Sequence, residues 1–183
     1  MLKKLKRLKN QSNIVFKSRF LANLAPDERY EFLQLCHRRS YKEGEYVFYK
    51  NDPGTGMYFI EDGEVELTIG VPDDTEERHE DDGFILKRAG SFGVLSIGYD
   101  LRRKSSARCL TDCELLGFFK PDFEVLKSRH PHIAVKFLQT LSNIALRQLE
   151  VTTKRLAHFS DEHTALQIQF DTYFEDQLPE DAI

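Results

Sequence analysis

The chain has 183 residues, of which 40% are hydrophobic and 31% charged, which is enough apolar material for a folded core. Its net charge of −4 argues against a protein that coats nucleic acid over its whole surface. No apolar run reaches the length of a membrane-spanning helix and no secretory segment opens the chain, so we expect a cytoplasmic protein.

Residues 1–19 form a basic extension, with seven Lys or Arg and no acid. Leu2, Leu5 and Leu8 recur every three residues between the lysines, as in a short amphipathic helix that would lie on an anionic membrane. Three leucines bury little apolar area. We therefore favour a solvated helix start over membrane binding.

Residues 20–158 are predicted to form one folded domain. Pro26 and Asp27 suit a helix start, and the apolar residues after them predict a helix over residues 26–38. Between about residues 40 and 119, short strands recur at spacings of roughly 8–12 residues, which is typical of an antiparallel sheet that closes on itself. The predicted strands are 45–49, 57–60, 65–69, 84–86, 105–109 and 114–119. The pattern predicts an α+β fold, an antiparallel β-roll or jelly roll of about eight strands flanked by helices.

The acidic run from Asp73 to Asp82 is expected to be a long hairpin loop. Closing helices are predicted over about residues 121–158, a short one at 122–129 and a long one from Pro131 to about His158. The apolar residues of the long helix cover more than one face. The second face either packs within the same subunit or meets the same helix of another subunit; we favour a homodimer through residues 131–158.

Residues 159–183 form an acidic C-terminal tail with seven acids and no Lys or Arg. Four large apolar or aromatic residues interrupt it: Ile168, Phe170, Tyr173 and Phe174. These side chains suggest that the tail docks on another surface, such as the basic N-terminus.

A glycine-rich stretch runs from Gly90 to Gly98 after a predicted strand. If a short helix begins near Val94, its free backbone N–H groups form an anion site. Arg103 lies nine residues after Val94 and would complete that site, because a guanidinium matches phosphate oxygens. Glycines between strands are also common as simple turns, so the stretch alone leaves both readings open.

The order of these parts resembles the cyclic-nucleotide-binding domain family of catabolite-activator type. Residues 58–65 look like that family's strand turn, and residues 92–96 (Phe-Gly-Val-Leu-Ser) look like its phosphate-binding cassette. Arg103 falls at the position of the family's phosphate-binding arginine, and residues 108–115 resemble the turn after it. The resemblance covers about residues 20–158.

The resemblance implies a ligand site rather than a catalytic one. The cassette, Phe92, Gly93, Val94, Leu95 and Ser96, would hold a cyclic phosphate through backbone N–H groups. The arginine and the residues after it that would approach the ligand are Arg103, Ser105 and Ser106, and late in the long helix Thr152 and Thr153 would contact the base across a dimer. The implied ligand is cAMP or cGMP, and no cofactor is required.

Two positions depart from the family pattern. Val94 stands where the family has a glutamate that accepts a hydrogen bond from the ribose 2′-hydroxyl, and Arg102 stands where it usually has proline. The phosphate half of the site is therefore expected to remain while the ribose half is lost. Weak cyclic-nucleotide binding, a different anionic ligand and a ligand-free fold all remain open.

Enzymatic readings find no support in the sequence. The six histidines are scattered, and no nucleophile motif, metal triad or paired carboxylates stand out. Cys36, Cys109 and Cys113 lack partner ligands for zinc and indicate buried, reduced thiols. Only 25 residues follow His158, and seven of them are acidic, so we expect no DNA binding. The leading hypothesis is a stand-alone, bacterial-type regulatory sensor that signals through its long helix to a dimer mate or a separate effector. The rival is a ligand-free fold that acts as a protein or membrane interaction module.

Overall fold

The computed structural model describes residues 14, 17–69, 83–94, 97 and 101–175, which fall into two compact units, residues 1–140 and residues 141–183. The predicted loop at 73–82 and most of the basic extension lie outside the described residues. The strands are β1 (His37–Tyr41), β2 (Tyr46–Phe48), β3 (Gly56–Asp62), β4 (Val65–Thr68), β5 (Gly83–Leu86), β6 (Ser91–Phe92), β7 (Ser106–Cys109) and β8 (Cys113–Phe119). The helices are α2 (Pro26–Gln34), α3 (Lys120–Arg129), α4 (Pro131–Phe159) and α5 (Glu162–Glu175).

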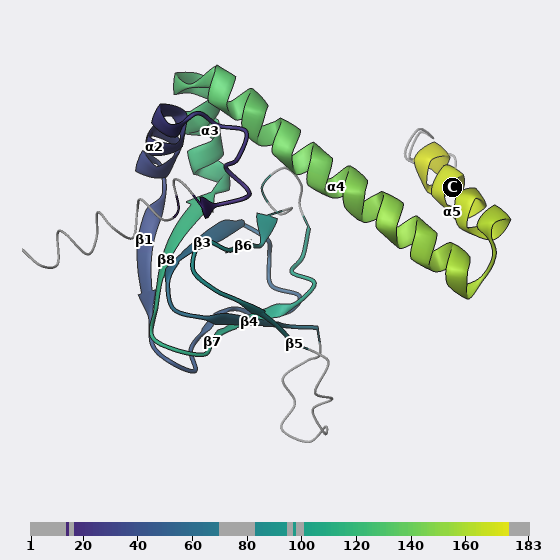
Figure 1. Cartoon of the computed structure of the whole chain (residues 1–183), viewed down its shortest axis with the longest axis horizontal. Helices are drawn as coiled ribbons and strands as arrows, with labels where there is room; N and C mark the ends of the chain where they lie inside the picture. The colour runs from purple at the N-terminus through teal and green to yellow at the C-terminus, as the bar shows by residue number, and fades with distance from the viewer. Residues whose placement is uncertain (1–13, 15–16, 70–82, 95–96, 98–100, 176–183) are drawn as a thin grey trace, which may run out of the picture. The chain divides into compact units, whose positions relative to one another are not determined.

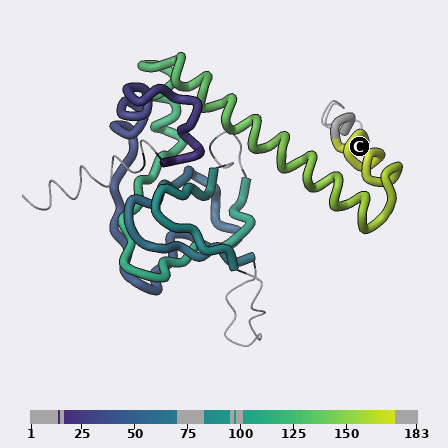
Figure 2. The backbone as a smooth tube through the Cα atoms, viewed as in Figure 1, coloured from purple at the N-terminus to yellow at the C-terminus, as the bar shows by residue number. Residues whose placement is uncertain are grey.

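The first unit holds two four-stranded antiparallel sheets, with strand orders β1-β8-β3-β6 and β2-β7-β4-β5 (Figure 1). Chain neighbours β3 and β4 belong to different sheets, as do β7 and β8, so the chain turns from one sheet to the other at each corner. Figure 2 follows this path as a tube through the same strands. The predicted α+β fold with an antiparallel β-roll is confirmed.

The first helix is shorter than its prediction. The prediction of helix through residue 38 is wrong, because α2 ends at Gln34 and His37 already pairs with Gly117 of β8. The side chains of β1 are mostly exposed, so they carry no alternation of apolar and polar residues that would mark a strand. Pairing with β8, which is a long-range contact, therefore decides the conformation of this segment.

Phenylalanines from α2, β8, α4 and the segment before α2 form one aromatic cluster in the core. Phe137 of α4 lies 5.3 Å from Phe20, 5.6 Å from Phe32 and 5.4 Å from Phe118, measured between ring centroids. Edge-to-face and offset pairs at such distances stabilise a core beyond their buried area. This cluster anchors the first turns of α4 to the β-roll of the first unit.

A second apolar cluster lies between the two sheets and includes Phe48, Tyr58, Phe92 and Cys109. Phe92 stacks on Tyr58, with 5.4 Å between ring centroids, and lies 5.9 Å from Phe48. The packing of the Phe92 ring thus fixes the position of β6. This short strand, which periodicity did not reveal, positions the glycine-rich stretch that follows.

In the second unit the chain forms two helical segments, the later part of α4 and α5. The segment predicted as an acidic tail contains α5, whose start is capped by Asp161: the Thr164 N–H and hydroxyl both donate to its carboxylate, at 2.9 and 2.7 Å. Thr153 of α4 donates to the Gln169 side-chain oxygen of α5 at 3.2 Å, and Ala165 is buried. The two helices therefore pack on each other. None of the helices described is long and apolar enough to cross a membrane.

Candidate functional site

The glycine-rich stretch turns sharply immediately after β6. Gly93 has φ of +72°, a left-handed conformation that side-chain-bearing residues rarely adopt. A Cβ added at Gly93 would lie 2.5 Å from Nη1 of Arg103. Glycine is therefore needed here both for the backbone conformation and for the close approach of the arginine.

Arg103 is 4% exposed, which is unusual for a guanidinium. Its Nη2 donates to the carbonyl oxygen of Gly56 at 2.6 Å and its Nη1 donates to that of Gly93 at 3.2 Å. The guanidinium carbon lies 4.2 Å from the ring centroid of Phe48, within cation–π range. The side chain thus joins β2, the start of β3 and the end of β6.

The backbone on either side of Arg103 is tied to the turn before β3. The Arg103 N–H donates to the Asp52 carbonyl and its own carbonyl accepts from the Asn51 N–H, both at 2.9 Å. Burial lowers the pKa of Arg103, partly offset by Tyr58 and Asp52, but an arginine stays protonated under all ordinary conditions. The structure therefore holds a buried cation at the glycine-rich turn.

Val94 follows Gly93 directly and is half-buried. Leu95 and Ser96, the other two residues expected to offer N–H groups to a phosphate, lie outside the described residues. Arg102 is exposed, and its Nη1 donates to the Asn51 carbonyl at 2.7 Å. Its charge points to solvent, while that of its neighbour Arg103 points inward.

The two serines after the arginine differ. Ser106 is fully buried, and its hydroxyl accepts a hydrogen bond from the Lys50 N–H at 2.9 Å, which ties β7 to the end of β2. Ser105 is half-buried. Of the two, Ser105 has the freer side chain, and the Ser106 hydroxyl serves the packing of the sheet.

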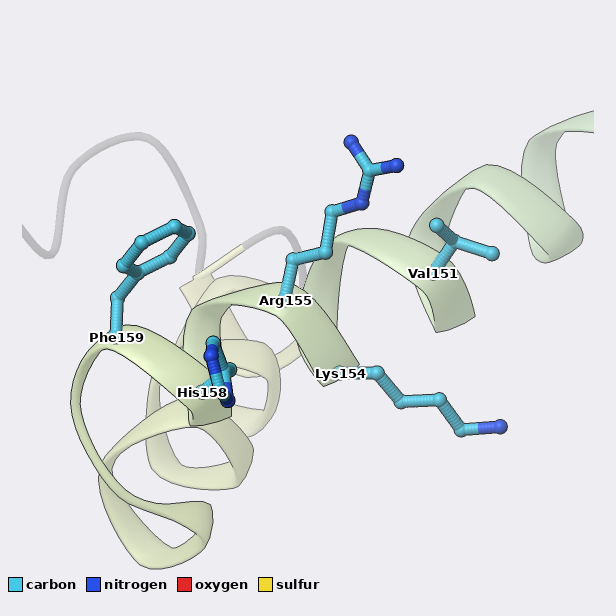
Figure 3. A pocket seen from close by; sticks show the side chains of 5 residues that line it. All are labelled: Val151, Lys154, Arg155, His158 and Phe159. Carbon is cyan, nitrogen blue, oxygen red and sulfur yellow. The ribbon is translucent and has the colours of Figure 1, made fainter.

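The predicted base-contacting threonines belong to the second unit. Thr152 is exposed, whereas Thr153 donates both to the Leu149 carbonyl at 2.9 Å and to Gln169. A shallow hollow on this unit is lined by five residues of α4, namely Val151, Lys154, Arg155, His158 and Phe159 (Figure 3). None of the predicted site residues lines it.

Sequence reasoning missed the partners that hold Arg103. Phe48 falls within the predicted strand 45–49, and Gly56 lies just before the predicted strand 57–60. Backbone carbonyls leave no mark on the residue sequence, so the acceptor at Gly56 had no signal. The aromatic ring of Phe48 did carry one, because a buried arginine often lies on an aromatic face.

The three cysteines are free thiols, and Cys109 and Cys113 are buried. Burial, together with the neighbouring Cys113 thiol, raises the pKa of Cys109 to about 12. A thiol in this state is a poor nucleophile and metal ligand. Among the described residues no cluster of three or more His, Cys, Asp or Glu has the arrangement of a metal site.

Comparison with known proteins assigns the fold. The family model for the cyclic nucleotide-binding domain matches residues 38–130, half of the chain, and contains both Gly93 and Arg103. The chain belongs to the cyclic nucleotide-binding domain family. This confirms the resemblance drawn from the cassette and the arginine.

Individual relatives agree with the family. The chain is 32% identical over 114 residues to the cyclic AMP receptor protein of Thermus thermophilus, covering 61% of this chain and 50% of that protein. It is 28% identical over 107 residues to the cAMP-dependent protein kinase regulatory subunit of Emericella nidulans, covering 58% and 24%. The chain thus spans half or less of the length of these curated relatives.

Solved structures show the same fold. The Thermus thermophilus catabolite activator protein superposes with a TM-score of 0.62 at 28% identity, covering 76% of this chain and 63% of that one. The N-terminal domain of a transcriptional regulator from Streptomyces coelicolor gives a TM-score of 0.65 at 19% identity, covering 76% and 94%. The second likeness concerns the fold alone. The chain therefore carries a regulatory, cyclic-nucleotide-binding type of fold.

Proposed function

We propose that the chain is a cytoplasmic regulatory sensor module that binds a cyclic nucleotide, cAMP or cGMP, or another small phosphate-bearing anion weakly. The observation that carries the proposal is the distance of 3.2 Å between Nη1 of Arg103 and the carbonyl oxygen of Gly93. A buried guanidinium beside a left-handed glycine turn is suited to a phosphate, because the N–H groups after Gly93 and the arginine would face the same oxygens. The names of the cAMP-linked relatives support the same ligand class.

The ribose half of the site differs from the phosphate half. Val94 offers no acceptor for a ribose hydroxyl. A hydrogen bond to a charged group contributes about 1.5–3 kcal/mol, so its absence weakens binding about ten- to a hundred-fold. A ligand without a free 2′-hydroxyl would not lose this hydrogen bond. The absence of an acceptor at Val94 therefore favours such anions over ribonucleotides by the same factor.

The carbonyls that hold Arg103 also reduce the net gain from a ligand. A phosphate that takes the guanidinium must replace the bonds from Arg103 to the Gly93 and Gly56 carbonyls. Hydrogen bonds between charged partners are stronger than those to neutral carbonyls, so the exchange remains favourable. The binding energy is nevertheless a difference between two bonded states of Arg103, which supports a weak affinity.

In this proposal α4 transmits the signal. A ligand shifts the population of the two states only if its contacts differ between them. Thr152 and Thr153 would contact the base from the second copy of a homodimer formed through residues 131–158, and Thr153 would then exchange its bond to Gln169 for one to the ligand. Output would pass to a separate effector protein without catalysis and without DNA contact. The sensor domain would comprise residues 20–158, with the basic and acidic segments outside it.

Titration calorimetry of the purified chain with cAMP and cGMP tests the proposal. We expect dissociation constants above the micromolar range. Val94→Glu restores the carboxylate and should tighten binding about ten- to a hundred-fold. Val94→Leu, which changes size without adding an acceptor, is the matched control and should leave the affinity unchanged within a factor of two or so. Submicromolar binding by the unmodified chain would show that the ribose hydroxyl finds another partner.

A second candidate function is a ligand-free interaction module. The observation that favours it is that the carbonyls of Gly56 and Gly93 already satisfy two guanidinium nitrogens of Arg103, so the fold does not need an anion at this turn. If neither the unmodified chain nor Val94→Glu releases or absorbs heat with about 1 mM of either nucleotide, this candidate replaces the sensor.

A further inference from the structure

The side chain of Phe48 points into the β-roll, onto the guanidinium of Arg103. Its partner on β7 is the fully buried Ala107, and the register of β2 on β7 shifts between Tyr46 and Phe48. An irregularity of this kind on a strand at the end of a sheet re-aims the side chain that follows it. The shift therefore turns Phe48 inward, and its ring centroid lies 4.2 Å from the guanidinium carbon of Arg103.

The Phe48 ring also packs against the strand that leads into the glycine-rich turn. Its centroid lies 5.9 Å from that of Phe92, the residue before Gly93, and 6.3 Å from that of Tyr58. Rings at such distances pack directly on one another. One face of the Arg103 guanidinium is thus covered by a ring, while its two Nη atoms donate to backbone carbonyls.

A free phosphate and a nucleotide make different demands on this arrangement. An oxyanion approaches a guanidinium in its plane, along the N–H bonds, so it exchanges with the backbone carbonyls and leaves the ring face covered. The sugar and base of a nucleotide must then lie either in solvent, where they add few contacts, or inside the β-roll. Inside they would meet the rings of Phe48, Phe92 and Tyr58. A nucleotide therefore gains over free phosphate only if a ring moves.

Phe48 is the ring best placed to move. It is 9% exposed, against 3% for Phe92 and 7% for Tyr58, and it belongs to a strand of three residues.

The backbone after Phe48 is held in place. The Tyr49 N–H donates to the Asp52 carboxylate at 2.8 Å, and the Lys50 N–H donates to the Ser106 hydroxyl at 2.9 Å. A movement of the ring is therefore a rotation of the side chain rather than a shift of β2.

We propose that Phe48 determines which anions the site accepts. With its ring on Arg103, the site takes a small oxyanion such as inorganic phosphate. A cyclic nucleotide binds with its sugar inside the β-roll only in the fraction of molecules whose ring has turned away, and its affinity is reduced by that fraction. This inference rests on the proposed function, because it concerns the ligand class of the same arginine.

Titration calorimetry of the full-length chain with inorganic phosphate, cAMP and cGMP at one ionic strength tests the proposal. We expect phosphate to bind with a dissociation constant of about 1–10 mM and neither nucleotide to bind more tightly. Phe48→Leu removes the ring face, so the nucleotides should bind about ten-fold more tightly, since no cation–π contact has to be broken. The affinity for phosphate should not rise in this variant, because phosphate leaves the ring in place.

Phe32→Leu is the matched control. Phe32 is fully buried in the aromatic cluster of the helices, 5.8 Å from Phe59 and 5.6 Å from Phe137 between ring centroids. The same change there should lower stability but leave the ratio of nucleotide to phosphate affinity within about a factor of two of its original value. Phe48→Ala is a second variant that opens more space, and circular dichroism checks that each variant is folded. Arg103→Ala should abolish the heat of phosphate binding.

Several results would overturn the inference and leave the proposed function standing. They are tighter binding of a nucleotide than of phosphate by the unmodified chain, a ratio of affinities that neither Phe48 variant changes, and an equal change in Phe32→Leu. Phosphate binding that survives Arg103→Ala would overturn it too, because the anion would then lie elsewhere. Absence of heat with all three probes, from the unmodified chain and from both Phe48 variants, would overturn the proposed function as well.

Discussion

Gly93→Ala is the substitution that most directly probes the arginine at the glycine-rich turn. The new Cβ would lie 2.5 Å from Nη1 of Arg103 and 3.1 Å from the Gly56 carbonyl oxygen. Something must move, and the mobile group is the guanidinium. If it moves, its bonds to the carbonyls of Gly93 and Gly56 are lost or lengthened.

Two separate costs add in this variant. An alanine at a φ of +72° costs roughly 1–2 kcal/mol, because its Cβ approaches the following carbonyl. Disturbing the charged hydrogen bonds of Arg103 costs a further 1.5–3 kcal/mol or so. We therefore expect the free energy of unfolding to fall by about 2.5–5 kcal/mol.

Gly44→Ala separates the two costs. Gly44 also has positive φ, +84°, but a Cβ there would meet only Nη2 of Arg108 at 3.6 Å, an ordinary contact. This control therefore measures the backbone cost alone. Urea denaturation followed by circular dichroism gives both free energies, with equal m-values as the check on two-state unfolding.

The difference in unfolding free energy between the two alanine variants measures what the Arg103 hydrogen bonds contribute. We expect Gly93→Ala to be less stable than Gly44→Ala by about 1.5–3 kcal/mol, the value of the Arg103 hydrogen bonds. In an Arg103→Ala background the difference should disappear, since the clash is removed with the guanidinium. Equal losses at Gly93 and Gly44 would refute the idea that the arginine is held by this turn.

Two further predictions concern ion pairs of the first unit. The Lys136 ammonium donates to both oxygens of Glu28, and this bond, followed by that from the Ala25 N–H, lowers the pKa of Glu28 below 4.5. Lys136→Met should therefore lower the free energy of unfolding by about 1 kcal/mol at neutral pH. The difference from the unmodified chain should fade as the pH falls below 4.5 and the carboxylate protonates, which urea denaturation at a series of pH values checks. Glu61 is fully buried, and Nη1 of Arg38 lies 2.5 Å from its Oε2. Arg38→Met should destabilise the chain by about 3–5 kcal/mol, because it removes a partner of a buried charge. A melting temperature lowered by less than the two or three degrees typical of surface changes would contradict this.

Most of the strands and both closing helices followed from local pattern, while β1 and β6 did not. In β8 the apolar residues and the preceding turn are local signals, and β8 is where the sequence predicts a strand. In β1 the residues are mostly exposed, and their extended conformation comes from pairing with β8 over 70 residues away in sequence. Local propensity contains no information about such a partner.

The candidate site divides in the same way. Gly93 and Arg103 were predicted by residue type and spacing, because a left-handed turn needs glycine and a phosphate favours arginine. The carbonyl of Gly56 and the ring of Phe48, which hold the arginine in place, could be found only from the folded chain. The sequence therefore predicts the residues that would bind a phosphate better than it predicts the groups that already hold Arg103 in the folded chain.

That competition separates the two candidate functions. In the sensor, the bonds from Arg103 to carbonyls are exchanged for bonds to a phosphate, so replacing Arg103 lowers both the stability of the chain and its affinity for ligand. Val94→Glu adds an acceptor without touching the arginine, so it should change the affinity and leave the stability nearly unchanged. In the ligand-free module the first substitution still lowers stability, because the carbonyls of Gly56 and Gly93 lose their donor, while the second changes nothing that calorimetry can detect. The two substitutions measured together therefore distinguish an arginine kept for a ligand from one kept for the fold.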